Sequence, residues 1–177
     1  MNSINPPHVS SNGDFLPEAL KALADMDNHT GTKCIVALFS GDQGTGKTVA
    51  AIDLASSRGA AFLRVKLTSV ISKCTGETEK NLERLLRATE SAETVVFFDE
   101  ADAILGKGGE TTETNDGFAN FDPEYLLQRL KEFWGIVILA VNQKEDLDDA
   151  FVEKLSVIVE FPLAESSPPQ LASGLRP

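Results

Sequence analysis

Residues 41–48 read Gly-Asp-Gln-Gly-Thr-Gly-Lys-Thr, between an apolar run at 34–39 and a segment of helical character that begins at Thr48. This stretch fits the pattern Gly-x-x-x-x-Gly-Lys-Thr, in which glycines let the backbone wrap closely around phosphate oxygens. In the order strand, loop, helix, successive N–H groups and the positive end of the helix dipole face the same anion. A glycine-rich turn that matches by chance is the alternative, and the flanking strand and helix argue against it.

The side chains of this loop have expected roles. The Lys47 ammonium would reach the β- and γ-phosphates of a nucleotide, and the Thr48 hydroxyl would hold Mg²⁺. We expect the backbone and side chains of the whole run to contact the nucleotide, which gives Gly41, Asp42, Gln43, Gly44, Thr45, Gly46, Lys47, Thr48 and Val49 as binding residues.

A second stretch brings two acids to the end of a strand. Four apolar residues, 95–98, are followed directly by Asp99 and Glu100. In open α/β sheets ligands bind at the C-terminal ends of the strands, so these carboxylates are expected at the phosphate site. Asp99 would be the outer-shell partner of Mg²⁺, and Glu100 would polarise an attacking water as a general base. The alternative is a strand that ends in solvated acids.

Asn142 ends the apolar run 136–141 in the same way. If this strand lies between the strand before the loop and the strand before Asp99, the amide points between Lys47 and Glu100. A neutral amide in that place can hold the attacking water or a γ-phosphate oxygen. The alternative is an Asn that ends a strand because turns favour it.

Composition limits the class of protein. A chain of 177 residues with 42% hydrophobic residues can form one sizeable core. No apolar run approaches the roughly 18 residues of a membrane helix, and the first residues do not resemble a signal peptide. Cys34 and Cys74 lie in a buried strand and a polar loop, so we expect no disulfide and a cytoplasmic protein.

The net charge of −11 arises in the second half of the chain. Residues 1–90 hold ten Lys/Arg and ten Asp/Glu, whereas residues 91–177 hold six and seventeen. Nucleic-acid binding needs clustered basic residues, so we expect no nucleic-acid partner. The acidic half favours a solvated surface or a basic protein partner.

The order of expected elements predicts an α/β fold. Residues 1–13 are expected to form a flexible leader, 14–163 the nucleotide-binding core, and 164–177 a disordered tail. Alternating strands and helices indicate a parallel sheet with helices on both sides, which is a three-layer fold. The expected strands are 34–40, 61–67, 94–98, 135–141 and 157–161, and the expected helices are 18–26, 48–57, 77–91, 123–133 and 147–155.

Together these residues resemble the nucleotide-binding core of AAA+ ATPases over about residues 34–162. The blocks that carry the resemblance are 41–48, 76–82 (Gly-Glu-Thr-Glu-Lys-Asn-Leu), 97–103 (Phe-Phe-Asp-Glu-Ala-Asp-Ala), 140–142 (Ala-Val-Asn), 147–151 (Leu-Asp-Asp-Ala-Phe) and 160–162 (Glu-Phe-Pro). The run from Tyr125 to Asn142 is similar to AAA ATPases that accompany phage-tail-like contractile injection particles. The resemblance implies a P-loop NTPase fold with a five-stranded parallel sheet, Mg-ATP binding, ring assembly and ATP-driven remodelling of protein partners. It also implies that Asn142 is the sensor residue.

The chain departs from the family at the positions that act on a neighbouring subunit. Where the family has an arginine pair that reaches into the neighbour's ATP, this sequence has Glu153 and Lys154. A carboxylate repels a γ-phosphate, and a lysine lacks the guanidinium fork. The substrate-gripping loop has Cys74 in place of its aromatic residue, and a thiol offers a threaded peptide much less stacking area.

The family's helical lid should follow residue 162, and only about fifteen residues remain, so we expect a core that lacks the lid, as a fragment or as a reduced relative.

Two functions remain open from the sequence. The first is an ATPase coupled to protein remodelling or assembly, expected to be slow in isolation and to be completed by a different subunit in a ring. The second is a regulatory or adaptor module that binds ATP with little or no turnover. A nucleic-acid helicase, suggested by the run Asp99-Glu100-Ala101-Asp102, would need basic grooves and a second domain.

Overall fold

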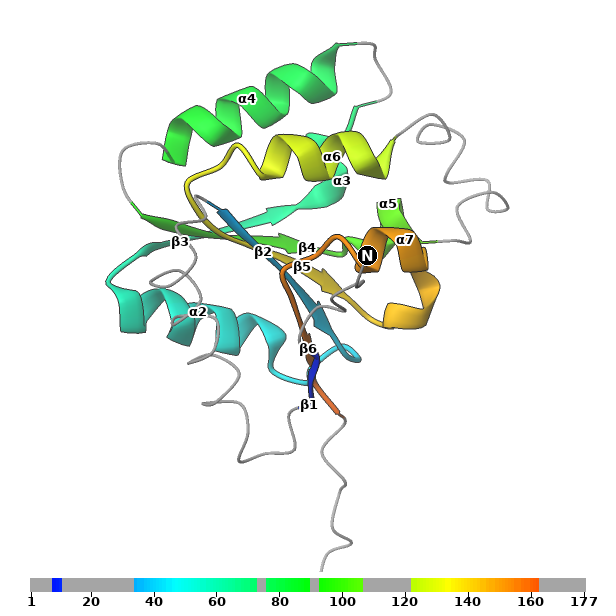
Figure 1. The fold of residues 1–177 in the computed structure, drawn as a ribbon. Coiled ribbons are helices and arrows are strands. Elements are labelled where there is room, and N and C mark those ends of the chain that lie inside the picture. The colour runs from blue at the N-terminus through cyan, green and yellow to red at the C-terminus, as the bar shows by residue number, and fades with distance from the viewer. Residues whose placement is uncertain (1–7, 11–33, 73–75, 90–92, 107–121, 163–177) are drawn as a thin grey trace, which may run out of the picture.

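A parallel β-sheet forms the centre of the computed structural model, which describes residues 8–10, 34–72, 76–89, 93–106 and 122–162. All pairings between its strands are parallel, in the order β1-β6-β2-β5-β4-β3 (Figure 1). The strands are β1 (His8–Ser10), β2 (Cys34–Ser40), β3 (Ala61–Lys66), β4 (Thr94–Asp99), β5 (Gly135–Val141) and β6 (Val157–Glu160). The five parallel strands expected from the sequence are confirmed, each to within a residue of its expected ends.

The sixth strand, β1, corrects the expectation of a flexible leader over residues 1–13. His8, Val9 and Ser10 pair with Ile158, Val159 and Glu160 at one edge of the sheet. A three-residue segment has no usable apolar alternation, so its extended form depends on a partner strand about 150 residues away in the sequence. The other residues of this expected leader, and the expected helix at 18–26 and tail at 164–177, lie outside the described residues.

Strand order places β5 between β2 and β4, as the interpretation of Asn142 required. The register aligns Ser40 with Val141, and Phe98 with Leu139. The residues that follow β2, β4 and β5 therefore meet at one edge of the sheet. Parallel strands present the ligand-binding loops of an α/β protein at that carboxyl edge.

Helices cover both faces of the sheet and give three layers (Figure 1). On one face α2 (Lys47–Arg58) packs Ala50, Ala51 and Leu54 against the sheet. The opposite core contains residues of the elements α3 (Leu67–Val70), α4 (Glu77–Thr89), α5 (Asp102–Leu105), α6 (Pro123–Leu130) and α7 (Asp149–Val152). Because both faces are covered, all seven residues of β2 are buried, which explains their continuous apolar sequence.

Two expected helices are shorter than their sequence patterns suggest. The one at 123–133 ends at Leu130, whereas the one at 77–91 is helical through Thr89, and its last two expected residues lie outside the described residues. The segment 147–155 contains only the short α7, preceded by the 3₁₀ turn η1 (Lys144–Asp146). The Asp148 carboxylate accepts a hydrogen bond from the Ala150 N–H at 2.8 Å, so Asp148 caps α7 and fixes where it begins.

None of the helices in the described ranges is both long and apolar enough to cross a membrane. Cys34 is a buried free thiol in β2, and burial raises its pKa to about 12. Its position confirms the expected buried strand, whereas Cys74 lies outside the described residues.

Candidate active site

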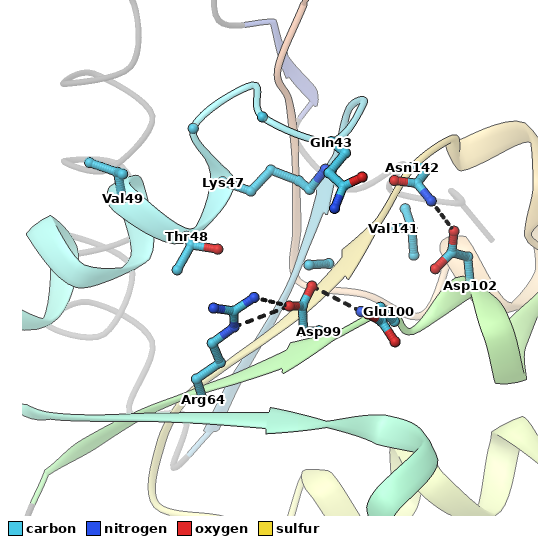
Figure 2. A pocket seen from close by; sticks show the side chains of 13 residues that line it. Gln43, Lys47, Thr48, Val49, Arg64, Asp99, Glu100, Asp102, Val141 and Asn142 are labelled. Atoms are coloured by element: carbon cyan, nitrogen blue, oxygen red, sulfur yellow. Dashed lines mark hydrogen bonds and ion pairs between the residues drawn. The ribbon is translucent and has the colours of Figure 1, made fainter.

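A cavity lies at the carboxyl edge of the sheet, between α2 and the ends of β4 and β5 (Figure 2). Its volume of about 520 Å³ lies in the range of ligand pockets. It is lined by Gln43, Gly44, Gly46, Lys47, Thr48, Val49, Arg64, Asp99, Glu100, Asp102, Ala140, Val141 and Asn142. The structure thus brings together Lys47, Thr48, Asp99, Glu100 and Asn142, to which the sequence assigned chemistry. Gly41, Asp42 and Thr45 belong to the same loop but do not line the cavity.

Two glycines give the loop its shape. A Cβ atom at Gly41 would lie 2.4 Å from the Phe161 carbonyl oxygen, so only glycine fits between the loop and the end of β6. Gly46 has φ +97° immediately before α2, a backbone conformation that side chains with a Cβ rarely adopt. The loop therefore folds tightly back and begins the helix with its N–H groups directed away from α2.

The first turn of α2 is suited to an anion. Gly46 offers no side chain to cap the helix, and the intrahelical bonding begins with the Ala50 N–H, which donates to the Gly46 carbonyl at 2.9 Å. The preceding amides, at Lys47, Thr48 and Val49, have no acceptor within the helix. A twelve-residue helix also places its positive dipole end there. These features fit phosphate oxygens, the group that the loop sequence predicted.

Lys47 folds back over the loop. Its Nζ donates to the carbonyl oxygens of Gly41 and, at 3.0 Å, of Asp42. Burial lowers the pKa of the Lys47 ammonium below its ordinary value, and the carboxylates of Asp102, Asp99 and Asp42 oppose that shift. A cation held by two weak carbonyl acceptors in a partly desolvated place can turn to a bound phosphate.

Glu100 has an unusual backbone. Its φ of +54° is the only positive value at a non-glycine residue within the described part of the chain. Its N–H donates to Asp99 Oδ1 at 3.0 Å, and its side chain is 53% exposed. Such strained conformations occur most often at functional sites. Here the turn lets two consecutive acids both reach the cavity, where an extended strand would send them to opposite faces.

Two cations of β3 pair with these acids. Arg64 donates to Asp99 Oδ2 from Nε at 3.1 Å and also from Nη2, and Lys66 Nζ donates to Glu100 Oε1 at 2.9 Å. Figure 2 shows the Arg64 side chain rising from β3 to Asp99. The sequence interpretation missed both residues. Arg64 and Lys66 are two residues apart in a strand, which indicates that their side chains share one face of the sheet. Only the β3–β4 register shows that these side chains lie beside Asp99 and Glu100.

Asn142 is anchored by a further acid. Its Nδ2 donates to Asp102 Oδ2 at 2.6 Å, and both residues line the cavity (Figure 2). A carboxylate only accepts, so the Asn142 amide nitrogen must face Asp102. Asp102 begins α5, three residues after Asp99, and its side chain had no assigned role in the sequence interpretation.

Thr48 and Asp99 bring the oxygen groups that suit a small divalent cation to the cavity. A hydroxyl and a carboxylate are hard donors of the kind Mg²⁺ takes, and both line the same cavity. No group of three His, Cys, Asp or Glu residues in the described ranges could hold a metal alone. The donor set therefore fits Mg²⁺ that shares its coordination with nucleotide phosphates and water, the usual arrangement for this ion.

The positions expected to reach a neighbour lie elsewhere. Glu153 and Lys154 follow α7, and neither lines the cavity. Lys154 forms an ion pair with Glu124 of α6. Arg129, another candidate cation, pairs with Glu132 at 2.6 Å. The gripping-loop position Cys74 lies outside the described residues.

Comparison with known proteins gives a family match over most of the chain. Residues 37–163 match the family described as ATPase family associated with various cellular activities (AAA). Protein SAV of Sulfolobus acidocaldarius is 34% identical over 123 residues, which is 65% of this chain and 15% of that protein. A 26S proteasome regulatory subunit 4 homolog of Arabidopsis thaliana is 34% identical over 138 residues (72% and 30%). Fidgetin-like protein 1 of Drosophila melanogaster is 31% identical over 161 residues (84% and 30%).

These relatives do not support the narrower resemblance to ATPases of contractile injection particles. The chain spans less than a third of the length of each of them. The family match, however, covers the loop, the acid-tipped strand and Asn142 together. The chain therefore belongs to the AAA family of ATPases.

Proposed function

We propose that this chain binds Mg-ATP at the cavity and hydrolyses it slowly, in the service of remodelling or assembling protein partners. The observation that carries the proposal is the convergence of Lys47, Thr48, Asp99, Glu100 and Asn142 on one cavity beside the open N-terminus of α2. Residues 41–49 would cradle the phosphates. The remodelling role rests on the family and on its resemblance to relatives such as the proteasome regulatory subunits.

Each side chain has a part in this reaction. Lys47 turns from the loop carbonyls to the terminal phosphates and balances their charge. Glu100 accepts a proton from the attacking water, and the Asn142 amide orients that water or a γ-phosphate oxygen. Thr48 and Asp99 would hold Mg²⁺, which supplies neutralisation of the phosphate charge when bound.

Two features favour slow turnover in isolation. Lys66 holds the Glu100 carboxylate at 2.9 Å, so the proposed base is engaged in an ion pair. Glu153 and Lys154 stand where a ring-forming relative would offer arginines to its neighbour, and loss of an arginine finger costs about 10³- to 10⁵-fold in related phosphoryl transfer. We therefore propose that any ring form is completed by a different subunit that carries a basic finger.

A cytoplasmic location stays a prediction.

Binding and hydrolysis should be measured separately on the full chain. Calorimetry with ADP and Mg²⁺ should show saturable binding, and phosphate release should stay below about 1 s⁻¹, under the ~10 s⁻¹ typical of enzymes. Glu100→Gln should abolish the residual release and keep the binding, whereas Glu79→Gln, an exposed acid on α4, should change neither.

Three results would redirect the proposal. Binding without any Glu100-dependent release favours the second function, a regulatory or adaptor module. Release at several per second by the chain alone would contradict the proposal that it needs a different subunit for full activity. Absence of nucleotide binding would overturn the proposed function itself.

A further inference from the structure

The cavity contains a cation that the loop, the acid-tipped strand and Asn142 do not account for. Arg64 lies on β3, the last strand at its edge of the sheet, and its guanidinium reaches the cavity beside Asp99. Arg64 pairs in register with Phe97, so it reaches Asp99 diagonally along the neighbouring strand. The contact is two-pronged, with Nε and Nη2 both donating to Oδ2 of one carboxylate.

This contact occupies the acid proposed to serve Mg²⁺. Asp99 Oδ1 accepts the Glu100 N–H at 3.0 Å, and Oδ2 accepts Arg64. Both oxygens are therefore engaged. A guanidinium and a divalent cation repel one another at a separation of a few ångströms, so the two do not share Asp99 readily.

The contact can nevertheless be given up. The Arg64 side chain is 56% exposed, whereas that of Asp99 is 19% exposed. A solvated guanidinium can swing back into water at little cost, and exposed ion pairs are individually weak. Asp99 is fixed at the end of a buried strand and cannot follow.

We propose that Arg64 competes with Mg²⁺ for Asp99, so that nucleotide-linked metal binding must displace the guanidinium. Arg64 is thereby a positioning residue that sets the Mg²⁺ concentration at which the site loads. This inference rests on the proposed nucleotide site. It predicts that a neutral residue at position 64 makes the site load at lower Mg²⁺.

The test measures how Mg²⁺ changes affinity for ADP, because ADP avoids turnover. On the full chain, ADP affinity is measured by calorimetry from EDTA to 10 mM MgCl₂, to give the Mg²⁺ concentration of half-maximal effect. Arg64→Gln should lower this concentration by about three- to tenfold, the scale of a partly exposed charge-assisted pair. The matched control is Lys66→Gln, which removes a positive charge two residues after Arg64. The partner of Lys66 is Glu100, which is not proposed to hold the metal. Lys66→Gln should therefore shift the half-maximal Mg²⁺ concentration by less than about twofold.

A second pair of variants isolates the contact. In an Asp99→Asn background, Arg64→Gln should produce no further change in Mg²⁺ dependence, because the shared ligand is gone. Thermal unfolding of each variant separates misfolding from a loss of competition, and Arg64→Lys, which keeps the charge without the fork, should lie between wild type and Arg64→Gln.

The outcomes distinguish this inference from the proposed function. Wild-type and Arg64→Gln proteins with the same Mg²⁺ requirement, or equal shifts in Arg64→Gln and Lys66→Gln, would overturn the competition while nucleotide binding stands. A lower unfolding temperature for Arg64→Gln with unchanged Mg²⁺ dependence would make the pair purely structural. Absence of ADP binding in every protein would remove the nucleotide site and this inference with it.

Discussion

The cavity and the surface after α7 hold their cations in different ways. In the cavity Lys47 and Arg64 lie among carboxylates and loop carbonyls that a ligand could replace. After α7, Lys154 pairs with Glu124 of the same chain, and its neighbour in sequence is the acid Glu153. In the proposed function, the first region receives a nucleotide, whereas the second lacks the arginines that would act on a neighbour's nucleotide.

Under the proposed function, this difference means that the nucleotide-receiving residues and the residues offered to a neighbour can change separately. The receiving half depends on strand ends that are fixed by a buried sheet. The contributing half depends on a few surface residues after a four-residue helix, whose substitution leaves the core intact.

The largest effect is expected from Lys47→Ala in the cavity. It removes a charge-assisted contact to phosphate, so ADP affinity in Mg²⁺ should fall about 100-fold, near the upper end for a hydrogen bond to a charged group. Calorimetry measures this, and Lys80→Ala on α4 is the control, since Lys80 is an exposed lysine outside the cavity. Equal affinities of Lys47→Ala and wild-type protein would show that the cavity is not the nucleotide site.

Introducing arginine at positions 153 and 154, on the surface after α7, should have the next largest effect. With both Glu153→Arg and Lys154→Arg, steady-state phosphate release at high protein concentration should rise by about tenfold or more, part of what an arginine finger supplies. Sedimentation should show ATP-dependent self-assembly.

The control for this double variant is Glu79→Arg with Lys80→Arg, the same change of residues and charge on the exposed face of α4. If both double variants act alike, the gain comes from net charge alone. A stable, active homo-ring of the unmodified chain with ATP would show that Lys154 or Arg129 already does the work.

A smaller effect is expected from Asp102→Asn, which tests how the cavity positions Asn142. Losing a charge-assisted hydrogen bond to the Asn142 amide should slow hydrolysis about three- to tenfold. ADP affinity should not fall, because the change removes negative charge near the phosphates. Asp53→Asn on the exposed side of α2 is the control. Unchanged hydrolysis by the Asp102→Asn variant would mean that Asn142 does not depend on its hydrogen bond to Asp102.

The smallest effect is expected from Glu124→Gln. Lys154 is 41% and Glu124 70% exposed, so breaking their pair should lower the free energy of unfolding by no more than about 1 kcal/mol. Urea unfolding measures this, with Glu83→Gln, partner of the exposed Arg87, as the control. A loss above about 2 kcal/mol, beyond the range of surface pairs, would mean that Lys154 is held too firmly to serve a neighbour.

The sequence predicted the parts of the site that are formed by residues close together in the chain. The loop at 41–48 and the acids at 99 and 100 follow apolar runs, and buried parallel strands are continuous apolar runs, so each motif could be placed at a strand end. Asn142 needed one further assumption, the position of β5 in the sheet, which the strand order confirms.

The sequence did not predict the features that depend on pairing between distant segments. β1 is extended through its partner β6. Arg64 and Lys66 meet the acids through the β3–β4 register, and Asp102 meets Asn142 across forty residues. The end of α6 at Leu130 was also misplaced, because helical propensity continues beyond the point where packing ends a helix.

By itself, then, the amino-acid sequence determined the strand–loop–helix around Lys47, the acids at the end of β4 and the family to which they belong, because these are local patterns of apolar runs, glycines and charges. Only the tertiary structure decided which cation faces which acid. Opposite charges interact through space over a few ångströms, so the partner of Asp99 is set by strand order and register, which neighbouring residues in the sequence do not encode.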